Sequence, residues 1–185
     1  MTPFVKLSDE VFYTRNPFVK FGADEINFLK ASVDKTQHKR IRLCAHLDIE
    51  DKLHEMIILI LDETYIRPAR HIDKAESLHV IHGEADAVFF DESGNITHVI
   101  PMAEPSSPGT FYYRMARPTY HTLLVNSPFF VFHECTKGPL IRAQTEFPSW
   151  APDEDDMGAV KEYMQLLRGR TAQFLDRNST VAESS

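Results

Sequence analysis

The stretch YIRPARHIDKAESLHVIHG (residues 65–83) combines groups that bind ligands with the apolar pattern of a strand. Residues two apart on a strand share a face, so Glu76 points to the same side as the apolar Leu78. A carboxylate on the core side of a sheet is costly to bury unless it is paired or binds a metal. His71, five residues earlier, could fold back beside it. The alternative is a surface turn, with His71 in solvent and Glu76 paired to Lys74.

Around this stretch, strand-like segments fill roughly residues 40–145 at short, even intervals. Such spacing is typical of an antiparallel sandwich or barrel. Residues 23–37 have helical spacing of apolar residues, and the segment after Trp150 begins with acids and ends with arginines, which suits a helix dipole. These patterns predict an N-terminal arm and helix (1–37), a barrel (38–148), a C-terminal helix (149–170) and a disordered tail (171–185).

The composition narrows the class of protein. The chain has 185 residues, of which 43% are hydrophobic and 25% charged, an ordinary balance for one domain. A net charge of −7 argues against a nucleic-acid partner. The longest apolar run, Met56–Leu61, is far too short to cross a bilayer, and the start lacks the pattern of a signal peptide. We therefore expect a cytoplasmic protein without a membrane partner.

A second stretch, RPTYHTLLV (residues 117–125), places His121 at the beginning of another strand. Taken alone, it fits a histidine that is satisfied at a sheet edge. Near the first stretch, Arg67 shares the side of His71 if the strand stays regular, so it could bind an anionic or sugar-phosphate ligand. Tyr65 and Tyr120 are further candidates for ligand contacts. The alternatives are an arginine paired with an acid on the surface and tyrosines that only pack.

Together the two stretches resemble the cupin superfamily. The first cupin motif is a pair of histidines one residue apart, then a glutamate and, after six residues, a glycine. His71, Glu76 and Gly83 match the second histidine, the glutamate and the glycine, and His121 matches the histidine that the second motif supplies. The resemblance implies a mainly β fold, the cupin double-stranded β-helix or jelly-roll barrel, with the N-terminal and C-terminal helices added to it.

The sequence is more closely similar to the WbuC-type cupins, small bacterial proteins linked to gene clusters for O-antigen and other surface polysaccharides. This similarity rests on RIRLCAHLDIEDKLHEMIILILDETYIRPARH, the KAE triplet, FFDESGNI, YHTLLV and FHECTKGP. It implies one divalent metal ion, such as zinc, iron, manganese or nickel, held by His71, Glu76 and His121.

Two departures from the family pattern concern this metal. WbuC-type proteins usually read PHRH where this chain has Pro68-Ala69-Arg70-His71, so Ala69 replaces the first histidine ligand. The second motif is also eroded, with Pro118 in place of a glycine. Two histidines and one carboxylate are also the ligand set of non-haem iron sites. The alanine therefore weakens, retunes or abolishes metal binding.

Three functions are compatible with these residues. The leading hypothesis is a cupin that binds a small molecule, a sugar or an anionic compound, beside a metal or degenerate metal site, in surface-polysaccharide or sugar-nucleotide metabolism. The second is a metal-independent sugar-nucleotide epimerase or ketoisomerase, with His71 or His121 as base and Tyr120 or Tyr112 as acid. The third is a non-enzymatic cupin that senses a ligand. Whether the chain is an enzyme stays open.

We also expect a homodimer, because cupins commonly associate through sheet edges and exposed edge strands need cover. The apolar residues of the N-terminal arm could pack across that interface. They could equally pack on the barrel of their own chain.

Overall fold

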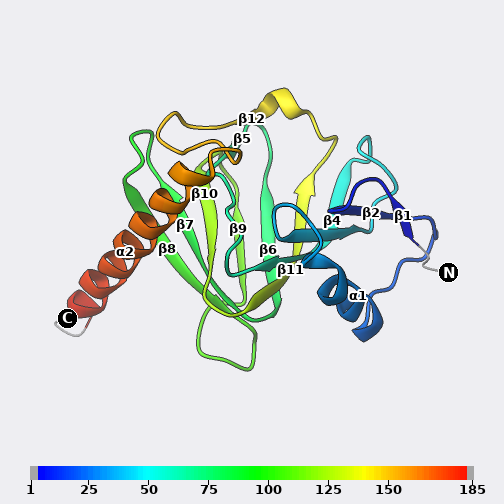
Figure 1. Cartoon of the computed structure of the whole chain (residues 1–185), viewed down its shortest axis with the longest axis horizontal. Coiled ribbons are helices and arrows are strands. Elements are labelled where there is room, and N and C mark those ends of the chain that lie inside the picture. The colour runs from blue at the N-terminus through cyan, green and yellow to red at the C-terminus, as the bar shows by residue number, and fades with distance from the viewer. Residues whose placement is uncertain (1–3, 183–185) are drawn as a thin grey trace.

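The computed structural model describes residues 4–182, with side chains up to residue 178. It is a barrel of two facing sheets (Figure 1). The larger sheet has, in spatial order, β1 (Phe4–Lys6), β2 (Val11–Thr14), β3 (Arg40–Cys44), β4 (Leu53–Leu61), β11 (Phe129–Lys137), β6 (Glu76–His82) and β9 (Tyr112–Met115). The smaller sheet has β10 (Tyr120–Val125), β7 (Glu84–Phe90) and β8 (Ile96–Ala103).

The remaining elements are short connections and two helices. The two-residue strands β5 (Arg70–His71) and β12 (Thr145–Glu146) pair with each other, and a 3-10 turn covers Arg142–Gln144. The helices are α1 (Ala23–Val33) and α2 (Met157–Ala182). Neither of these helices has the length and apolarity that a membrane crossing requires.

The central strands of the larger sheet are apolar on both faces, and this decides which side chains reach the interior. On β4, Ile58 and Ile60 face the interior of the barrel, where they pack with residues of both sheets. Ile57 and Leu59 face outward and pack with Leu29 of α1. The alternation of side chains along a strand explains this division. The sheet therefore has a second apolar core on its outer face.

The N-terminal arm covers that outer core. Phe4, Phe12 and Phe21 pack against the cluster that α1 and the larger sheet form. Strands β1 and β2 extend the sheet itself, with β2 parallel to β3. The arm thus packs on its own barrel, which is the second of the two placements that the sequence allows. The homodimer stays a prediction.

Helix α2 lies against the smaller sheet, on the side of the barrel away from α1 (Figure 1). Its Leu167 is buried among Val88, Phe90 and Leu124 of that sheet. The helix continues to Ala182, beyond the predicted end at residue 170. The buried Thr171 and the half-buried Phe174 give the additional turns something to pack against, and no glycine or proline interrupts them. Residues 183–185 of the predicted tail lie outside the described residues.

Candidate functional site

The barrel encloses a cavity of about 740 Å³ that opens at one end. Its walls are partly apolar, with Ile58, Leu78, Leu123 and Phe132 among the lining side chains. Pockets of this size and character are typical of sites for small ligands. The polar side chains of the lining form a few clusters, and different strands and segments contribute each cluster.

One cluster brings together the three residues that the sequence predicted to form a site. The Nε2 atom of His121 lies 2.6 Å from Oε1 of Glu76, and Nε2 of His71 lies 4.0 Å from Oε2 of the same carboxylate. The two imidazole rings are 6.2 Å apart between centroids. Glu76 is only 8% exposed, so the surface-turn alternative, with this carboxylate paired to a lysine, does not describe the structure.

Backbone pairing holds these side chains in place. Glu76 begins β6 and its side chain shares the inner face with Leu78, as the alternation predicts. His121 lies on β10, and its backbone exchanges two hydrogen bonds with that of Ala69, of 3.1 and 3.2 Å. This bridge draws the segment before β5 alongside β10. His71, two residues further on, is then fixed by the pairing of β5 with β12.

The other nitrogen of each imidazole is also engaged. Nδ1 of His121 donates to the backbone carbonyl of Thr119, 2.9 Å away, and Nδ1 of His71 lies 3.0 Å from the hydroxyl of Thr145. Such contacts fix the orientation of an imidazole and are common behind histidines that bind metals. Both Nε2 atoms are consequently directed toward Glu76.

Electrostatics couple Glu76 to His121. Burial alone would raise the pKa of Glu76, but the charge and hydrogen bond of His121 outweigh it and hold that pKa below its ordinary value. Burial alone would lower the pKa of His121, but Glu76 outweighs it and the pKa is raised. The two therefore form an ion pair. Burial lowers the pKa of His71, which favours its neutral form.

The donor set fits a divalent metal ion in its chemistry. Two imidazole nitrogens and a carboxylate suit zinc, iron, manganese or nickel. Within residues 4–182, no three His, Cys, Asp or Glu side chains are already spaced for coordination. Instead, His121 and Glu76 contact each other directly at 2.6 Å. Ala69 lines the cavity beside these residues, and its methyl group offers no lone pair.

Among the charged residues that line the cavity and that the sequence analysis did not select, two lie on the strands of the larger sheet opposite Met56 and Ile58. Glu134 of β11 lies on the inner face, in register with Met56 and Leu78. Burial and then the negative charge of Glu76 raise its pKa to about 7. Arg42 of β3, in register with Ile58, is half-buried in the same wall. Strand parity was the available signal, because Arg40, Arg42 and Cys44 must share one face.

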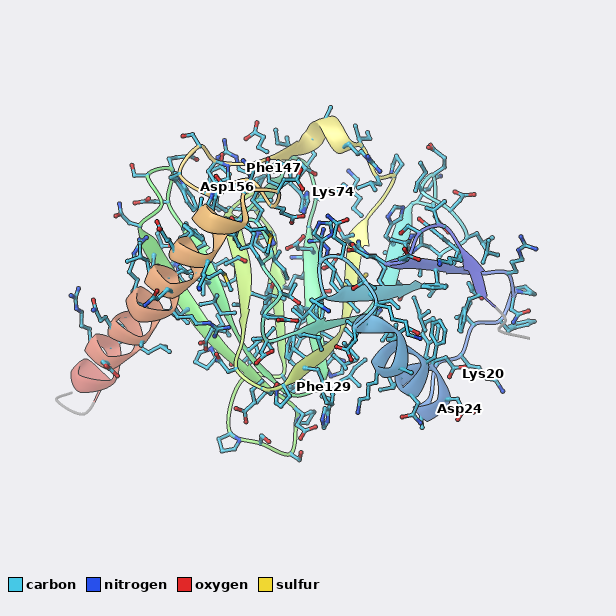
Figure 2. The ribbon with its side chains drawn as sticks, in the orientation of Figure 1. Lys20, Asp24, Lys74, Phe129, Phe147 and Asp156 are labelled. Atoms are coloured by element: carbon cyan, nitrogen blue, oxygen red, sulfur yellow. The ribbon has the colours of Figure 1, made fainter. Side chains whose placement is uncertain are left out.

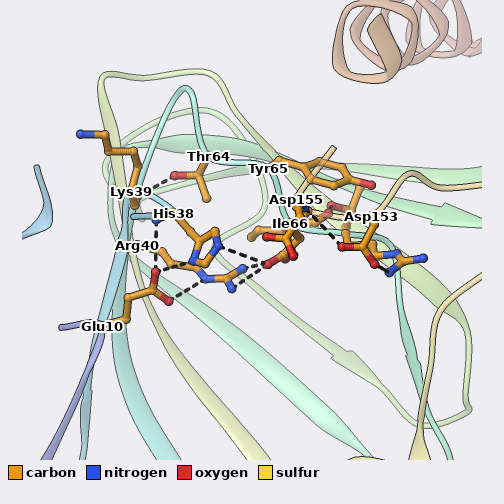
Figure 3. Close-up of polar contacts among 12 residues, drawn as sticks. Glu10, His38, Lys39, Arg40, Thr64, Tyr65, Ile66, Asp153 and Asp155 are labelled. Carbon is orange, nitrogen blue, oxygen red and sulfur yellow. Dashed lines mark hydrogen bonds and ion pairs between the residues drawn. The ribbon is translucent and has the colours of Figure 1, made fainter. Parts of the chain in front are cut away.

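Charged pairs border the opening of the cavity. The mouth segment (residues 147–156) connects the barrel to α2, and Phe147 and Asp156, which bound it, lie at the same end of the barrel as Lys74 (Figure 2). Arg40 donates two hydrogen bonds of 3.0 Å to Glu154 of this segment and one of 3.2 Å to Glu10 of the arm. These contacts belong to the network in Figure 3.

Of the three residues predicted to contact a ligand, Arg67 lines the cavity and the two tyrosines do not. Arg67 lines the cavity, but its guanidinium is 2.6 Å from Asp153 and stacks on Phe147, which is the paired arrangement considered as the alternative. The buried Tyr65 donates a hydrogen bond of 2.9 Å to the carbonyl of Pro152. Tyr120 packs against Trp150.

Neither Tyr65 nor Tyr120 lines the cavity, since both face the packing between the barrel and the segment before α2. Tyr112 is exposed on the outer face of β9. Its neighbour Tyr113 lines the cavity instead.

The two-sheet barrel with a cavity between the sheets is the cupin double-stranded β-helix, with one helix added on either side in sequence. A family model described as a domain of unknown function (DUF6016) matches residues 22–102. No curated protein matches the chain.

The solved structures that are similar include several cupins. Protein SO0799 from Shewanella oneidensis is 11% identical with a TM-score of 0.50, over 70% of this chain and 85% of that one. The cupin domain of Cnp3 from Schizosaccharomyces pombe is 8% identical with a TM-score of 0.42, over 55% and 66%. Oxalate decarboxylase from Bacillus subtilis is 17% identical with a TM-score of 0.41, over 54% and 24%. The chain therefore spans about a quarter of the length of oxalate decarboxylase. The similarity to SO0799, at 11% identity, concerns the fold alone.

Proposed function

We propose that this protein is a small-molecule-binding cupin that holds a divalent metal ion between His71, Glu76 and His121. The observation that carries the proposal is the convergence of two imidazole Nε2 atoms on one buried carboxylate at the wall of a cavity. A buried carboxylate with two imidazoles around it is costly unless it binds or pairs with a cation. In the metal-free protein, His121 is that cation.

The protein's own residues would position both the ion and the ligand. Thr119 and Thr145 orient the two imidazoles, and the small side chain of Ala69 leaves space for a water molecule or a ligand oxygen beside the ion. A bound ion would act as a Lewis acid toward that oxygen. The apolar wall limits the access of water to the rest of the ligand.

The test is metal analysis of protein prepared without a histidine tag. After dialysis against zinc, manganese, iron or nickel, we expect about one tightly held ion per chain for at least one metal. Glu76→Gln and His121→Ala should lose it, whereas His98→Ala, which removes an exposed histidine of β8, should keep it. Retention of no metal by the folded wild type, or equal loss in all three variants, would contradict the proposal.

The metal-independent epimerase or ketoisomerase is a second candidate, because burial lowers the pKa of His71 and so favours the neutral imidazole that a general base requires. Within the described residues, Tyr113 is the tyrosine that borders the cavity, so it replaces Tyr120 and Tyr112 as the candidate acid. Turnover of a nucleotide-linked keto sugar by metal-free protein, lost in Tyr113→Phe, would favour this function.

The resemblance to WbuC-type proteins supports a place in surface-polysaccharide or sugar-nucleotide metabolism. On that basis the ligand is a sugar, a sugar acid or a sugar nucleotide. Binding measurements with these compounds would test the metabolic context separately from the metal.

A further inference from the structure

Arg42 is turned into the barrel by the packing of its neighbours. Ile41 and Leu43, on either side of it in β3, pack outward against α1 and the outer core. Because side chains alternate along a strand, Arg42 must face the interior. There it lines the cavity and is half-buried. The cost of placing a guanidinium in such a position suggests a specific partner.

No such partner belongs to the protein as the structure describes it. Across residues 4–178, whose side chains are described, no carboxylate lies within 4.0 Å of the Arg42 guanidinium, and no hydrogen bond from its side chain is formed. Two other cavity arginines differ: Arg40 is paired with Glu154 and Glu10, and Arg67 with Asp153. Arg42 is thus a half-buried cation of the cavity wall that the mouth segment leaves without an acid.

The charge of the Arg42 guanidinium acts on Glu134 and favours its ionised form, but the two side chains form neither an ion pair nor a hydrogen bond. Burial, and then the negative charge of Glu76, raise the pKa of Glu134 to about 7, so near neutral pH this carboxyl group is only partly ionised. It does not neutralise Arg42 as a full carboxylate would. The exposed Arg142 at the opening adds a further positive group to the lining.

We propose that Arg42 anchors an anionic oxygen group of the ligand, a carboxylate or a phosphate, inside the cavity. The planar guanidinium presents paired N–H donors that match the two oxygens of such a group. The other end of the same ligand reaches the metal position at Glu76; this part of the inference rests on the proposed function. In the sheet, β4 and β11 separate β3 from β6, so the two backbones are roughly 14 Å apart at about 4.8 Å per strand.

The separation selects the kind of ligand. Because both side chains project from the same sheet, this gap is spanned by a small organic molecule and not by a single inorganic anion. A sugar acid or a sugar phosphate has an anionic group at one end and hydroxyl oxygens at the other. Glu134 lies on β11 between the two positions, where a neutral carboxyl group can donate a hydrogen bond to a ligand oxygen.

The test uses metal-free protein, so that anion binding is measured apart from metal binding. The chelator must be dialysed away, because it is itself an anion. Calorimetric titrations would compare glucuronate and glucose 6-phosphate with glucose as the neutral probe, and inorganic phosphate as the single anion. We expect an anionic sugar to bind more tightly than glucose. Preference for glucuronate or for glucose 6-phosphate would identify the carboxylate or the phosphate.

Arg42→Gln should weaken the binding of the anionic sugar on the order of tenfold, the effect of losing a charge-assisted hydrogen bond, and leave glucose unaffected. Arg42→Lys should lose less, because it keeps the charge without the paired donors; it also serves if the glutamine variant does not fold. The control Arg114→Gln removes an exposed arginine on the outer face of β9 and should change nothing.

Three outcomes would each overturn the inference. The wild type and Arg42→Gln could bind the anionic sugar equally well, or Arg42→Gln and Arg114→Gln could lose the same affinity for it. The wild type could also show no preference for an anionic probe over glucose. Metal titration of Arg42→Gln distinguishes a failure of the Arg42 inference from a failure of the proposed metal site. If that variant still takes up metal as the wild type does, failure of anion binding counts against Arg42 alone. If the wild type takes up no metal, the proposed metal site fails whatever the anion result.

Discussion

Replacing Glu134 by glutamine should stabilise the metal-free protein, and increasingly so as the pH rises. The side chain keeps nearly its shape and volume but can no longer ionise. In the folded protein this carboxyl group lies on the inner face of β11, where burial first and then the charge of Glu76 disfavour its ionised form. The substitution removes a group whose charge the fold tolerates poorly.

The magnitude follows from the two pKa values. The pKa of Glu134 rises from an ordinary 4.5 to about 7 in the folded chain. One pKa unit corresponds to about 1.4 kcal/mol, so ionising this group in the folded state costs on the order of 3 kcal/mol more than in the unfolded state. Because the folded state holds its proton more tightly, the free energy of unfolding falls as the pH rises between these values.

Below pH 4.5, where Glu134 is neutral in both the folded and the unfolded state, the variant and the wild type should differ little in their free energy of unfolding. Between pH 4.5 and 7 the wild type should lose stability relative to Glu134→Gln, and above pH 7 the difference should reach its plateau, on the order of 3 kcal/mol or less. Urea unfolding at pH 4.5, 6 and 8 measures this difference directly. Glu63→Gln, which neutralises an exposed glutamate, is the control. A variant no more stable than wild type at pH 8, or a difference independent of pH, would refute the reasoning.

Three further substitutions test the site and the fold. Ala69→His restores an imidazole at the cavity wall and should tighten metal binding on the order of tenfold or more in competition with a chelator; unchanged affinity in the folded variant would mean that position 69 does not face the ion. Thr145→Val removes the hydroxyl 3.0 Å from His71 and should weaken metal binding by roughly 10-fold with little change in thermal stability; a loss of stability without a loss of affinity would assign Thr145 a packing role only. Gly83→Ala should lower the free energy of unfolding by roughly 1–3 kcal/mol, because φ is +87° and a Cβ would lie 2.4 Å from a carbonyl oxygen; Gly169→Ala, in the open surface of α2, should instead stabilise by up to about 1 kcal/mol, and equal effects of the two would contradict the argument.

The spacing of strands and the chemistry of three residues were sufficient to predict much of this molecule. The even succession of short strands predicts a barrel, and two helical patterns predict α1 and the first part of α2. The expectation that His71, Glu76 and His121 lie near one another came from the resemblance to the cupin motifs, since the cost of burying a carboxylate left a surface turn open as an alternative. At Glu76, the strand alternation that turns the side chain inward agrees with the contacts of its carboxylate in the structure.

Arg42 and Glu134 were not predicted because alternation assigns residues to a face without saying which face is the interior. In β3 the apolar residues Ile41 and Leu43 would ordinarily mark the inner face. In this chain they mark the outer one, since α1 and the arm cover that side and form a second core. The polar face of β3 is consequently turned into the cavity. Only the three-dimensional position of α1 reveals this inversion.

The tyrosines illustrate a different limit. Tyr65 and Tyr120 are close in sequence to His71 and His121, and that closeness suggested a shared site. Their side chains instead pack toward Pro152 and Trp150, in the segment that follows the barrel. Contacts that depend on a distant part of the chain cannot be inferred from the spacing of nearby residues.

Arg40 joins three parts of the chain that are far apart in sequence. It contacts Glu10 of the arm and Glu154 before α2 at the cavity opening (Figure 3). The rim is therefore complete only when the N-terminal arm and the mouth segment have both docked on the barrel. By thermodynamic linkage, a ligand that requires this rim stabilises the docked arm and the docked C-terminal segment, although it touches neither core. Ligand binding should therefore also protect the arm and the mouth segment from proteases.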